Sequence, residues 1–538
     1  MDLLIKKMSK IQILDCTLRD GGYVNNWMFG RKCISIISQK LIESSIEIVE
    51  CGFLSQTKKC NGEQSIFNTI HDAERLITNS EKKYALMINC GEYDPNDLPQ
   101  YSGGSVTTLR IAFHKHQLEE AKQLLIGCKQ KGYRVFFQPM FTIGYSDYEL
   151  LDLINFVNEN EPEAVYIVDS FGTIRQNDLA RIFYLIDHNL NPSIILGFHS
   201  HNNLQLSFSN AQKLISICKK REIIIDSSIF GMGRGAGNLC TELITQYINE
   251  NIEDKYDLMP VLEIMDEYIM PIYSKNKWGY SAPYYIAAVN NCHPNYATYL
   301  MNLQTLCIRD ISALIKTIPD KNRHLYDSSL IEKLYIEYQQ HYVDDTALID
   351  EIKQCCKARK ILVLAPGKSL QTCREKINEY ISRENPLVFA INHVPDSIDC
   401  DKIFISNMRR FKNNDDIAHI NSSKLILTSN IQSGEIDNRV NYSSYLNDDV
   451  MITDNSGLML INILKKCGVT KIALAGFDGF NYSETENYCD HKMISHSNRV
   501  KYSEINRSMM KYFNKLKKSV EISFITPTLY EDSSNDQI

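Results

Sequence analysis

Eight short, almost wholly apolar runs recur over the first 230 residues, and they restrict the fold of this chain more than any other feature. Their near-continuous apolar character is typical of parallel strands that are buried on both faces. Between them lie longer stretches with helical spacing, such as residues 114–132. Eight β-α units over roughly 240 residues predict a (β/α)8 TIM barrel, an α/β fold. A doubly wound open sheet is the alternative, and the count of eight favours the barrel. The runs span residues 11–15, 46–52, 84–89, 108–113, 133–139, 164–169, 194–199 and 223–230.

The rest of the chain predicts a helical segment followed by a second α/β region. From Lys360 onward, apolar runs again alternate with amphipathic stretches, which predicts a Rossmann-like α/β domain. We therefore expect a barrel domain over residues 1–250, a helical extension and linker over 251–355, and the second domain over 356–530. The apolar runs of the second domain lie within 360–370, 386–392, 402–406, 424–429, 471–478 and 520–527.

The composition excludes several classes of function. The 538 residues carry a net charge of −7, without the basic surplus of a nucleic-acid-binding protein. No run reaches the roughly 18 to 20 apolar residues that span a bilayer. The N-terminus lacks the apolar stretch of a secretory signal. The 16 cysteines are scattered, without a C-x-x-C pair, and are typical of reduced thiols. We expect a cytoplasmic protein that binds neither nucleic acid nor membranes.

Polar residues gather where the predicted barrel strands end. The C-terminal ends of the strands carry the functional groups of TIM barrels, so these residues form the candidate site. They are Arg19 and Asp20 after the first run, Glu50 in the second, Ser170 after the sixth, His199 and His201 at the seventh, and Asn238 in the glycine loop after the eighth.

The pair His199 and His201 indicates a metal site. Residues two apart on a strand project from the same face, so both imidazoles can reach one ion. Asp20 would add a carboxylate, and Asn238 an amide oxygen. Two nitrogens with hard oxygens suit Mg²⁺ or Mn²⁺ better than structural Zn²⁺, while Fe²⁺, Co²⁺ and Zn²⁺ stay open. An isolated H-x-H pair more often lies on the surface or packs against other polar groups. Here the other polar residues at the strand ends favour a metal site.

Arg19 and Glu50 predict an electrostatic role beside this ion. An arginine next to a metal can hold the oxygen of an enolate and stabilise its developing charge. Glu50 needs a partner because unpaired buried carboxylates are rare. Arg19 is the natural partner, so we expect Glu50 to orient Arg19.

Three motifs carry a resemblance to a known family. They are L-D-C-T-L-R-D-G-G at 14–22, G-F-H-S-H-N-N at 197–203 and G-M-G-R-G-A-G-N at 231–238. With the glutamate of the second run, they resemble the DRE-TIM metallolyases over roughly residues 10–300. That family includes 4-hydroxy-2-oxovalerate aldolase, HMG-CoA lyase, and the isopropylmalate, homocitrate and citramalate synthases. The resemblance implies that a divalent ion chelates pyruvate or a similar 2-oxo acid and that the barrels pair as homodimers. It also implies roles for seven residues: Asp20, His199, His201 and Asn238 bind the ion, Arg19 stabilises the enolate, Glu50 holds Arg19, and Ser170 lies near the substrate carboxylate.

Within this family the chain is most similar to the aldolase branch. Residues 278–284 are similar to the G-Y-A-G-V-Y stretch of these aldolases, which implies that Tyr280 lies by the substrate. The glycine loop has no cysteine before Cys240, which argues against HMG-CoA lyase and less strongly against the synthases. Tyr23 stands where the aldolases have a catalytic histidine.

Because a tyrosine acts as a base only with a lowered pKa, three groups stay open for proton transfer. They are Tyr23, Tyr280 and a water on the ion. Two other functions also stay open. One is a synthase that condenses an acyl-CoA with a 2-oxo acid, and the other is an inactive barrel that serves as a scaffold for a glycosyltransferase-like domain.

The second domain carries short motifs that are typical of nucleotide binding. The A-P-G-K-S-L turn at 365–370 offers backbone amides and a helix start to a phosphate, but it lacks the spacing of a P-loop. The region loosely resembles the Rossmann-like domains of bacterial sialyltransferases and related motility-accessory proteins. This resemblance implies a nucleotide or nucleotide-sugar ligand and a role in surface-polysaccharide metabolism. The residues at the matching positions are Gly367, Ser369, Asn392, Ser456, Gly457 and, as a late histidine base, His496.

Overall fold

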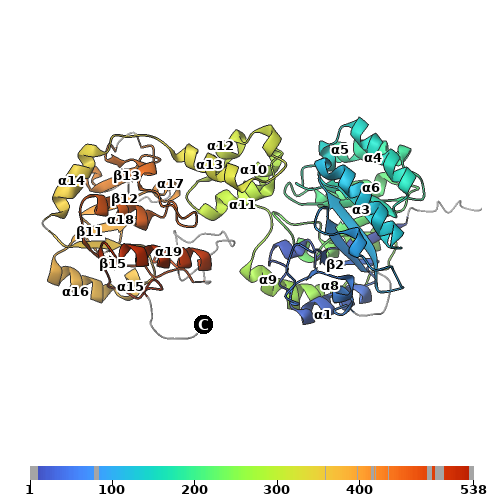
Figure 1. Cartoon of the computed structure of the whole chain (residues 1–538), viewed down its shortest axis with the longest axis horizontal. Helices are drawn as coiled ribbons and strands as arrows, with labels where there is room; N and C mark the ends of the chain where they lie inside the picture. The colour runs from blue at the N-terminus through green and yellow to red at the C-terminus, as the bar shows by residue number, and fades with distance from the viewer. Residues whose placement is uncertain are drawn as a thin grey trace, which may run out of the picture. The chain divides into compact units, whose positions relative to one another are not determined.

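The computed structural model describes residues 10–77, 84–357, 359–396, 398–412, 417, 420–433, 436–481, 487–490 and 502–531. The chain folds into two compact units (Figure 1). The barrel unit comprises the residues up to Thr298 together with Pro319–Tyr326. The C-terminal unit comprises Tyr299–Ile318 and the residues from Asp327 onward. The segment predicted as a helical extension, 251–355, is therefore divided between the two units.

The barrel unit contains a closed barrel of eight parallel strands, which confirms the predicted TIM-barrel fold. Strand β1 pairs with β9 on one side and with β2 on the other, so the sheet closes on itself. This closure excludes the open doubly wound sheet. A two-residue strand, β3 (Ile66–Phe67), pairs with β2 outside the barrel order. The barrel strands are β1 (Ile11–Asp15), β2 (Ile48–Leu54), β4 (Tyr84–Asn89), β5 (Val106–Phe113), β6 (Arg134–Pro139), β7 (Ala164–Asp169), β8 (Ile195–Ser200) and β9 (Ile223–Ser227).

The side chains of the barrel strands divide between two cores because successive residues of a strand point to opposite faces. Leu14, Phe136 and Tyr166 pack together in the barrel interior. Their neighbours Ile13 and Phe137 belong to the larger core between strands and helices. The filled interior leaves the strand ends as the place for chemistry. The helices of this part are α1 (Arg31–Glu43), α2 (Ile70–Glu74), α3 (Leu118–Gln130), α4 (Asp147–Asn160), α5 (Gln176–Asn189), α6 (Ser207–Ile217) and α7 (Thr241–Asn251).

The segment after the barrel is helical, as its sequence pattern predicts. Within the barrel unit, the amide of His293 donates to the carbonyl of Arg323 at 2.7 Å. The hydroxyl of Tyr296 lies 2.9 Å from the carbonyl oxygen of Asn322. These bonds tie residues 319–326 to the start of α11. The helices are α8 (Met259–Ile264), a π-helix η6 (Met265–Ile269), α9 (Met270–Lys275), α10 (Ala282–Val289), α11 (Pro294–Leu303), α12 (Ile308–Thr317), α13 (Ser328–Gln339) and α14 (Thr346–Cys356).

The C-terminal unit contains a parallel sheet with the strand order β14-β13-β12-β11-β10-β15-β16, which confirms the second α/β region. The chain steps outward from β10 to β14 and then returns to the other side of β10. Ile361 and Val363 of β10 belong to one buried cluster, whereas Leu362 and Leu364 belong to another, so the sheet is covered on both faces. The two-residue strand β14 was not among the predicted runs. The strands are β10 (Ile361–Leu364), β11 (Leu387–Ile391), β12 (Lys402–Ile405), β13 (Leu425–Thr428), β14 (Arg439–Val440), β15 (Lys471–Ala475) and β16 (Glu521–Phe524).

Helices connect these strands. They are α15 (Ser369–Thr372), α16 (Arg374–Glu384), α17 (Met408–Lys412), α18 (Ser456–Lys466) and α19 (Tyr502–Leu516). None of the described helices combines the length and apolar character that a membrane span requires.

Candidate metal centre

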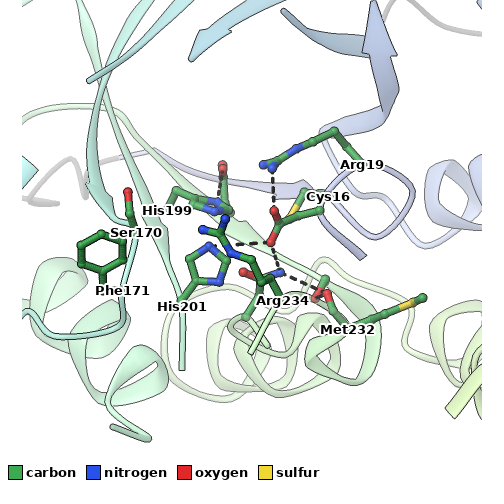
Figure 2. A network of polar contacts seen from close by, with 12 residues as sticks. Cys16, Arg19, Ser170, Phe171, His199, His201, Met232 and Arg234 are labelled. Atoms are coloured by element: carbon green, nitrogen blue, oxygen red, sulfur yellow. Dashed lines mark hydrogen bonds and ion pairs between the residues drawn. The ribbon is translucent and has the colours of Figure 1, made fainter. Parts of the chain in front are cut away.

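Asp20, His199 and His201 converge at the C-terminal end of the barrel (Figure 2). Asp20 follows β1, and the two histidines lie in and just after β8. One ligand atom of each residue lies within 4.8 Å of the others, and all three residues are buried. An isolated bridge pairs His201 with Asn238, which brings the glycine loop beside the histidines. The structure therefore gathers the four predicted ligands in one group that could hold a metal ion.

The donor atoms of this group suit a divalent cation. Burial lowers the pKa of His201 to about 3, so its imidazole is neutral at neutral pH. Burial alone would raise the pKa of Asp20, but the charge of Arg19 holds it well below its usual range. Asn238 donates from Nδ2 to Asp20 Oδ2 at 2.6 Å, while its Oδ1 is buried without a hydrogen-bond partner. Buried acceptors without partners are uncommon, and a cation beside Oδ1 would satisfy this one.

Buried ion pairs surround the carboxylate of Asp20. Arg19 Nη1 lies 2.6 Å from Asp20 Oδ1, and Arg19 Nε donates to Glu50 Oε2 at 2.7 Å. The contact that the sequence predicts between Arg19 and Glu50 is therefore present. Arg110 Nη1 lies 2.9 Å from the same oxygen of Glu50. Glu50 thus joins two buried guanidinium groups, which fixes the position of Arg19 beside Asp20.

Arg110 and Asp226 connect Glu50 to His199. Neither residue was predicted from the sequence as part of the site. Arg110 forms an ion pair with Asp226, and Asp226 Oδ2 lies 2.9 Å from His199 Nδ1. A carboxylate at Nδ1 places the proton on that nitrogen and leaves Nε2 free to bind a metal. The sequence held a signal for both residues, because each is a charge inside an otherwise apolar strand.

Close contacts explain two glycines of the loop that carries Asn238. A Cβ on Gly233 would lie 2.3 Å from Asn238 Nδ2. Gly237 has a φ of +83°, and a Cβ there would lie 2.0 Å from the carbonyl oxygen of Gly231. A larger residue at Gly233 would displace the Asn238 side chain, and one at Gly237 would collide with the backbone of Gly231.

Comparisons with known proteins agree with this geometry. The family model described as HMGL-like matches residues 10–267. The barrel of this chain is similar to the HMGL-like family over these residues, which make up slightly less than half of the chain. A 4-hydroxy-2-oxovalerate aldolase from Geobacillus genomosp. 3 is 26% identical over 266 residues, which cover 49% of this chain and 77% of that protein. Its counterpart from Pseudoalteromonas translucida is 23% identical over 279 residues, which cover 51% and 78%.

Solved structures are also similar to this chain. The crystal structure of hydroxymethylglutaryl-CoA lyase from Pseudomonas aeruginosa has a TM-score of 0.40 and 14% sequence identity. It covers 50% of this chain and 94% of the lyase. The HMGL-like model and the curated relatives support an enzyme of the aldolase and lyase type.

Tyr23 lies in a short 3-10 helix, η1 (Gly21–Tyr23), which directly follows the predicted metal ligand Asp20. Its ring packs edge-on against Trp27, with centroids 4.8 Å apart, and the guanidinium carbon of Arg234 lies 5.4 Å from its ring centre. Burial raises the pKa of Tyr23, although the charge of Arg234 opposes the shift. Tyr23 is therefore a neutral phenol at neutral pH, without the lowered pKa that a base would need.

Ser170 and Tyr280, the other two predicted site residues, differ in burial. Ser170 is buried, and its Oγ accepts a hydrogen bond from the amide of Phe141 at 2.8 Å. Tyr280 is 59% exposed. No hydrogen bond or ring contact of its side chain reaches the metal group among the described residues, so its role stays a prediction.

The residues predicted to bind a nucleotide form two hydrogen-bonded groups in the C-terminal unit. In the first, the Ser369 amide donates to Asp478 Oδ2 at 2.7 Å, and the Ser369 hydroxyl also bonds this carboxylate. The amide of Gly367 donates to the carbonyl of Gly476 at 3.1 Å. An anionic side chain thus already occupies part of the turn that the sequence predicts to hold a phosphate.

The second group centres on Ser456, at the start of α18. Asn392 Nδ2 donates to Ser456 Oγ at 2.6 Å, and Ser406 Oγ lies 2.6 Å from the same atom. Gly457 follows Ser456, and a Cβ there would lie 2.8 Å from the Phe477 ring. The predicted base, His496, lies outside the described residues.

Proposed function

We propose that the barrel unit is a divalent-metal-dependent aldolase that makes or breaks the carbon–carbon bond next to a 2-oxo acid. The observation that carries this proposal is the unpartnered Oδ1 of Asn238 beside an ionised Asp20 and a neutral His201. The similarity to 4-hydroxy-2-oxovalerate aldolases supports pyruvate as the 2-oxo acid. Two imidazoles with hard oxygens favour Mn²⁺ or Mg²⁺, and Co²⁺, Fe²⁺ and Zn²⁺ are the ions to compare.

The residues of the site suit enolate chemistry. An ion bound by the four predicted ligands would supply Lewis acidity toward the carbonyl of the 2-oxo acid. Asp20 and Glu50 hold Arg19 in place and keep it charged, so its guanidinium is suited to stabilise negative charge on that carbonyl oxygen. In condensation, a proton leaves C3 of the 2-oxo acid, C3 bonds to the aldehyde carbon, and the aldehyde oxygen takes up a proton.

We assign Tyr23 the role of the acid that protonates the aldehyde oxygen in the condensation direction. A neutral phenol donates a proton, and the nearby charge of Arg234 stabilises the anion that remains. Ser170 would contact the carboxylate of the 2-oxo acid, and Tyr280 would approach the substrate from the segment after the barrel. Replacing Tyr23 with Phe should slow condensation more than it slows loss of the C3 proton.

Deuterium exchange into the methyl group of pyruvate, followed by NMR, tests the enolate step without any aldehyde. We expect exchange with Mn²⁺ or Mg²⁺ and none after chelation. His199→Ala should abolish it, whereas His188→Ala, an exposed histidine on α5, should not change it. A wild-type chain that shows no exchange with any divalent ion would contradict the proposal and favour an inactive barrel scaffold. Thiol release from acetyl-CoA would instead identify a condensing synthase.

We also propose that the C-terminal unit binds a nucleotide or nucleotide sugar, which would connect the enzyme to surface-polysaccharide metabolism. The observation in favour is the strand order, because β10 and β15 are neighbours where the order of strands reverses. Ligands of open α/β sheets bind at such a switch point. Calorimetry with cytidine nucleotides and nucleotide sugars tests this proposal. Absence of binding by the full chain to each of these compounds would contradict it.

A further inference from the structure

Arg234 is a cation at the C-terminal end of the barrel without a carboxylate partner. Figure 2 shows its side chain running from the glycine loop toward His199 and His201. Within the described part of the chain, Arg234 takes part in no ion pair, and its contacts are the face of Tyr23 and the ring of His293. Its Nε is buried without a hydrogen-bond partner. A buried guanidinium nitrogen without a partner is costly, so the site lacks an acceptor.

His293 cannot supply that acceptor. Its Nδ1 accepts a hydrogen bond from the backbone amide of Asn295 at 3.1 Å. Burial and the charge of Arg234 hold the pKa of His293 well below its usual range, so the ring is neutral. A neutral imidazole that accepts at Nδ1 carries its proton on Nε2. The 3.4 Å contact between Arg234 Nη1 and His293 Nε2 therefore brings two donors together, and one anionic oxygen could accept from both.

Asp20 does not neutralise Arg234. Asp20 Oδ1 is 2.6 Å from Arg19, and Asp20 Oδ2 accepts from Asn238 at 2.6 Å. Arg234 therefore has no paired carboxylate among the described residues.

An aromatic ring packs against His293. The Phe171 ring lies edge-on to His293, with centroids 5.5 Å apart, and Phe171 directly follows Ser170. Phe141 packs against Phe171 at 4.7 Å and against His324 at 4.2 Å. These ring contacts place His293 at the same end of the barrel as the predicted metal ligands.

We propose that Arg234 and His293 bind an oxyanion, a carboxylate or a phosphate, at the far end of the substrate. The aldehyde half of the aldol product would then be anionic. This inference depends on the proposed function, because that function places the 2-oxo acid on the metal ligands and leaves the aldehyde half to face Arg234.

Binding of paired 2-oxo acids to the full, Mn²⁺-loaded chain tests the inference by calorimetry, without turnover. One pair is 2-oxoadipate and 2-oxohexanoate, which differ by a terminal carboxylate. The other is 6-phosphooxy-2-oxohexanoate and 6-hydroxy-2-oxohexanoate, which differ by a terminal phosphate. None of the four compounds has the 4-hydroxyl that aldol cleavage requires, so each can bind without turnover. Because hydrogen bonds to charged groups are stronger than those to neutral groups, the anionic member of at least one pair should bind about tenfold more tightly. The pair that shows this preference identifies the anion as a carboxylate or a phosphate.

Variants assign the preference to these two residues. Arg234→Gln should remove it, Arg234→Lys should restore part of it, and His293→Phe should reduce it while keeping the ring contact with Phe171. Arg134→Gln, at the start of β6 and paired with Glu163, is the matched control and should leave the preference intact. Equal binding within both pairs, or a preference that survives Arg234→Gln, overturns the inference. Absence of pyruvate exchange together with a retained preference would overturn only the proposed function.

Discussion

The two parallel sheets place polar residues at the same position, the carboxyl ends of their strands, but they satisfy these groups differently. At the barrel end, Asn238 Oδ1 and Arg234 Nε are buried without partners. In the C-terminal sheet, Asn392, Ser406 and Ser456 bond to one another. Among the described residues of the C-terminal unit, no buried side-chain nitrogen or oxygen lacks a hydrogen-bond partner.

This difference shows what each site must do to bind a ligand. At the barrel end, a cation and an anion would complete contacts that the protein leaves open, so binding adds interactions. At the C-terminal edge, a ligand must first replace bonds that the protein already makes, such as the one from Ser369 to Asp478. We therefore expect stronger binding at the barrel than at the C-terminal sheet.

The largest expected effect is on the stability of the barrel. Arg110→Met removes the cation between Glu50 and Asp226 and leaves both carboxylates buried. Breaking a buried ion pair in this way costs about 3–5 kcal/mol of unfolding free energy, measured by urea denaturation. Arg134→Met, which breaks a partly exposed pair with Glu163, should cost about 0–1 kcal/mol. Equal losses in the two variants would contradict the structural role given to Arg110.

The next effect is on metal affinity. Asp226→Asn keeps the shape of the side chain but no longer fixes the proton of His199 on Nδ1. Loss of such a partner typically weakens metal binding about 10- to 100-fold, which titration calorimetry with Mn²⁺ would detect. Arg134→Met serves again as the control, with unchanged affinity. Unchanged binding in Asp226→Asn would show that His199 does not use Nε2 as its ligand atom.

The sequence predicted most of the barrel and the ligand group because both depend on local signals. Apolar strands were visible as runs, and Asp20, His199 and Asn238 lie at the ends of such runs or in the loops that follow them. The pairing of Arg110 with Asp226 joins residues 116 positions apart, so it needed the closed barrel to become visible. The donor pair of Arg234 and His293 also became visible only in the structure. There the backbone amide of Asn295 bonds to His293 Nδ1, which places the proton of the ring on Nε2. Likewise, no local pattern foretold that Asp478 would occupy the turn before α15.

A pH-dependent effect follows from Asp15, at the end of β1. Burial raises the pKa of Asp15 to about 6, against the hydrogen bonds from Thr17 and Thr241. Its pKa in the unfolded chain is about 3.9, so the folded barrel favours the protonated form. The stability that this preference gives is present below about pH 4 and is lost as the pH rises to about 6, at up to about 1.4 kcal/mol per pH unit.

Asp15→Asn should remove this loss, which urea denaturation of the barrel at pH 4.5 and pH 6.5 would measure. Burial also raises the pKa of Asp478 in the C-terminal unit. The same substitution there serves as the comparison. Asp478→Asn should therefore reduce the pH dependence of that unit without altering the barrel transition. Parallel pH profiles for wild type and Asp15→Asn would show that Asp15 is ionised in the folded barrel.

The smallest expected effect concerns the hydrogen bonds among Asn392, Ser406 and Ser456 at the C-terminal sheet. Ser456→Ala removes the oxygen that both Asn392 and Ser406 contact, so it should cost roughly 1 kcal/mol of unfolding free energy in that unit. Ser422→Ala, at an exposed position, is the control and should be neutral. If Ser456→Ala instead leaves stability unchanged, another group replaces the lost bonds. The C-terminal edge would then be as adaptable as the barrel end, because its polar groups could exchange partners when a ligand binds.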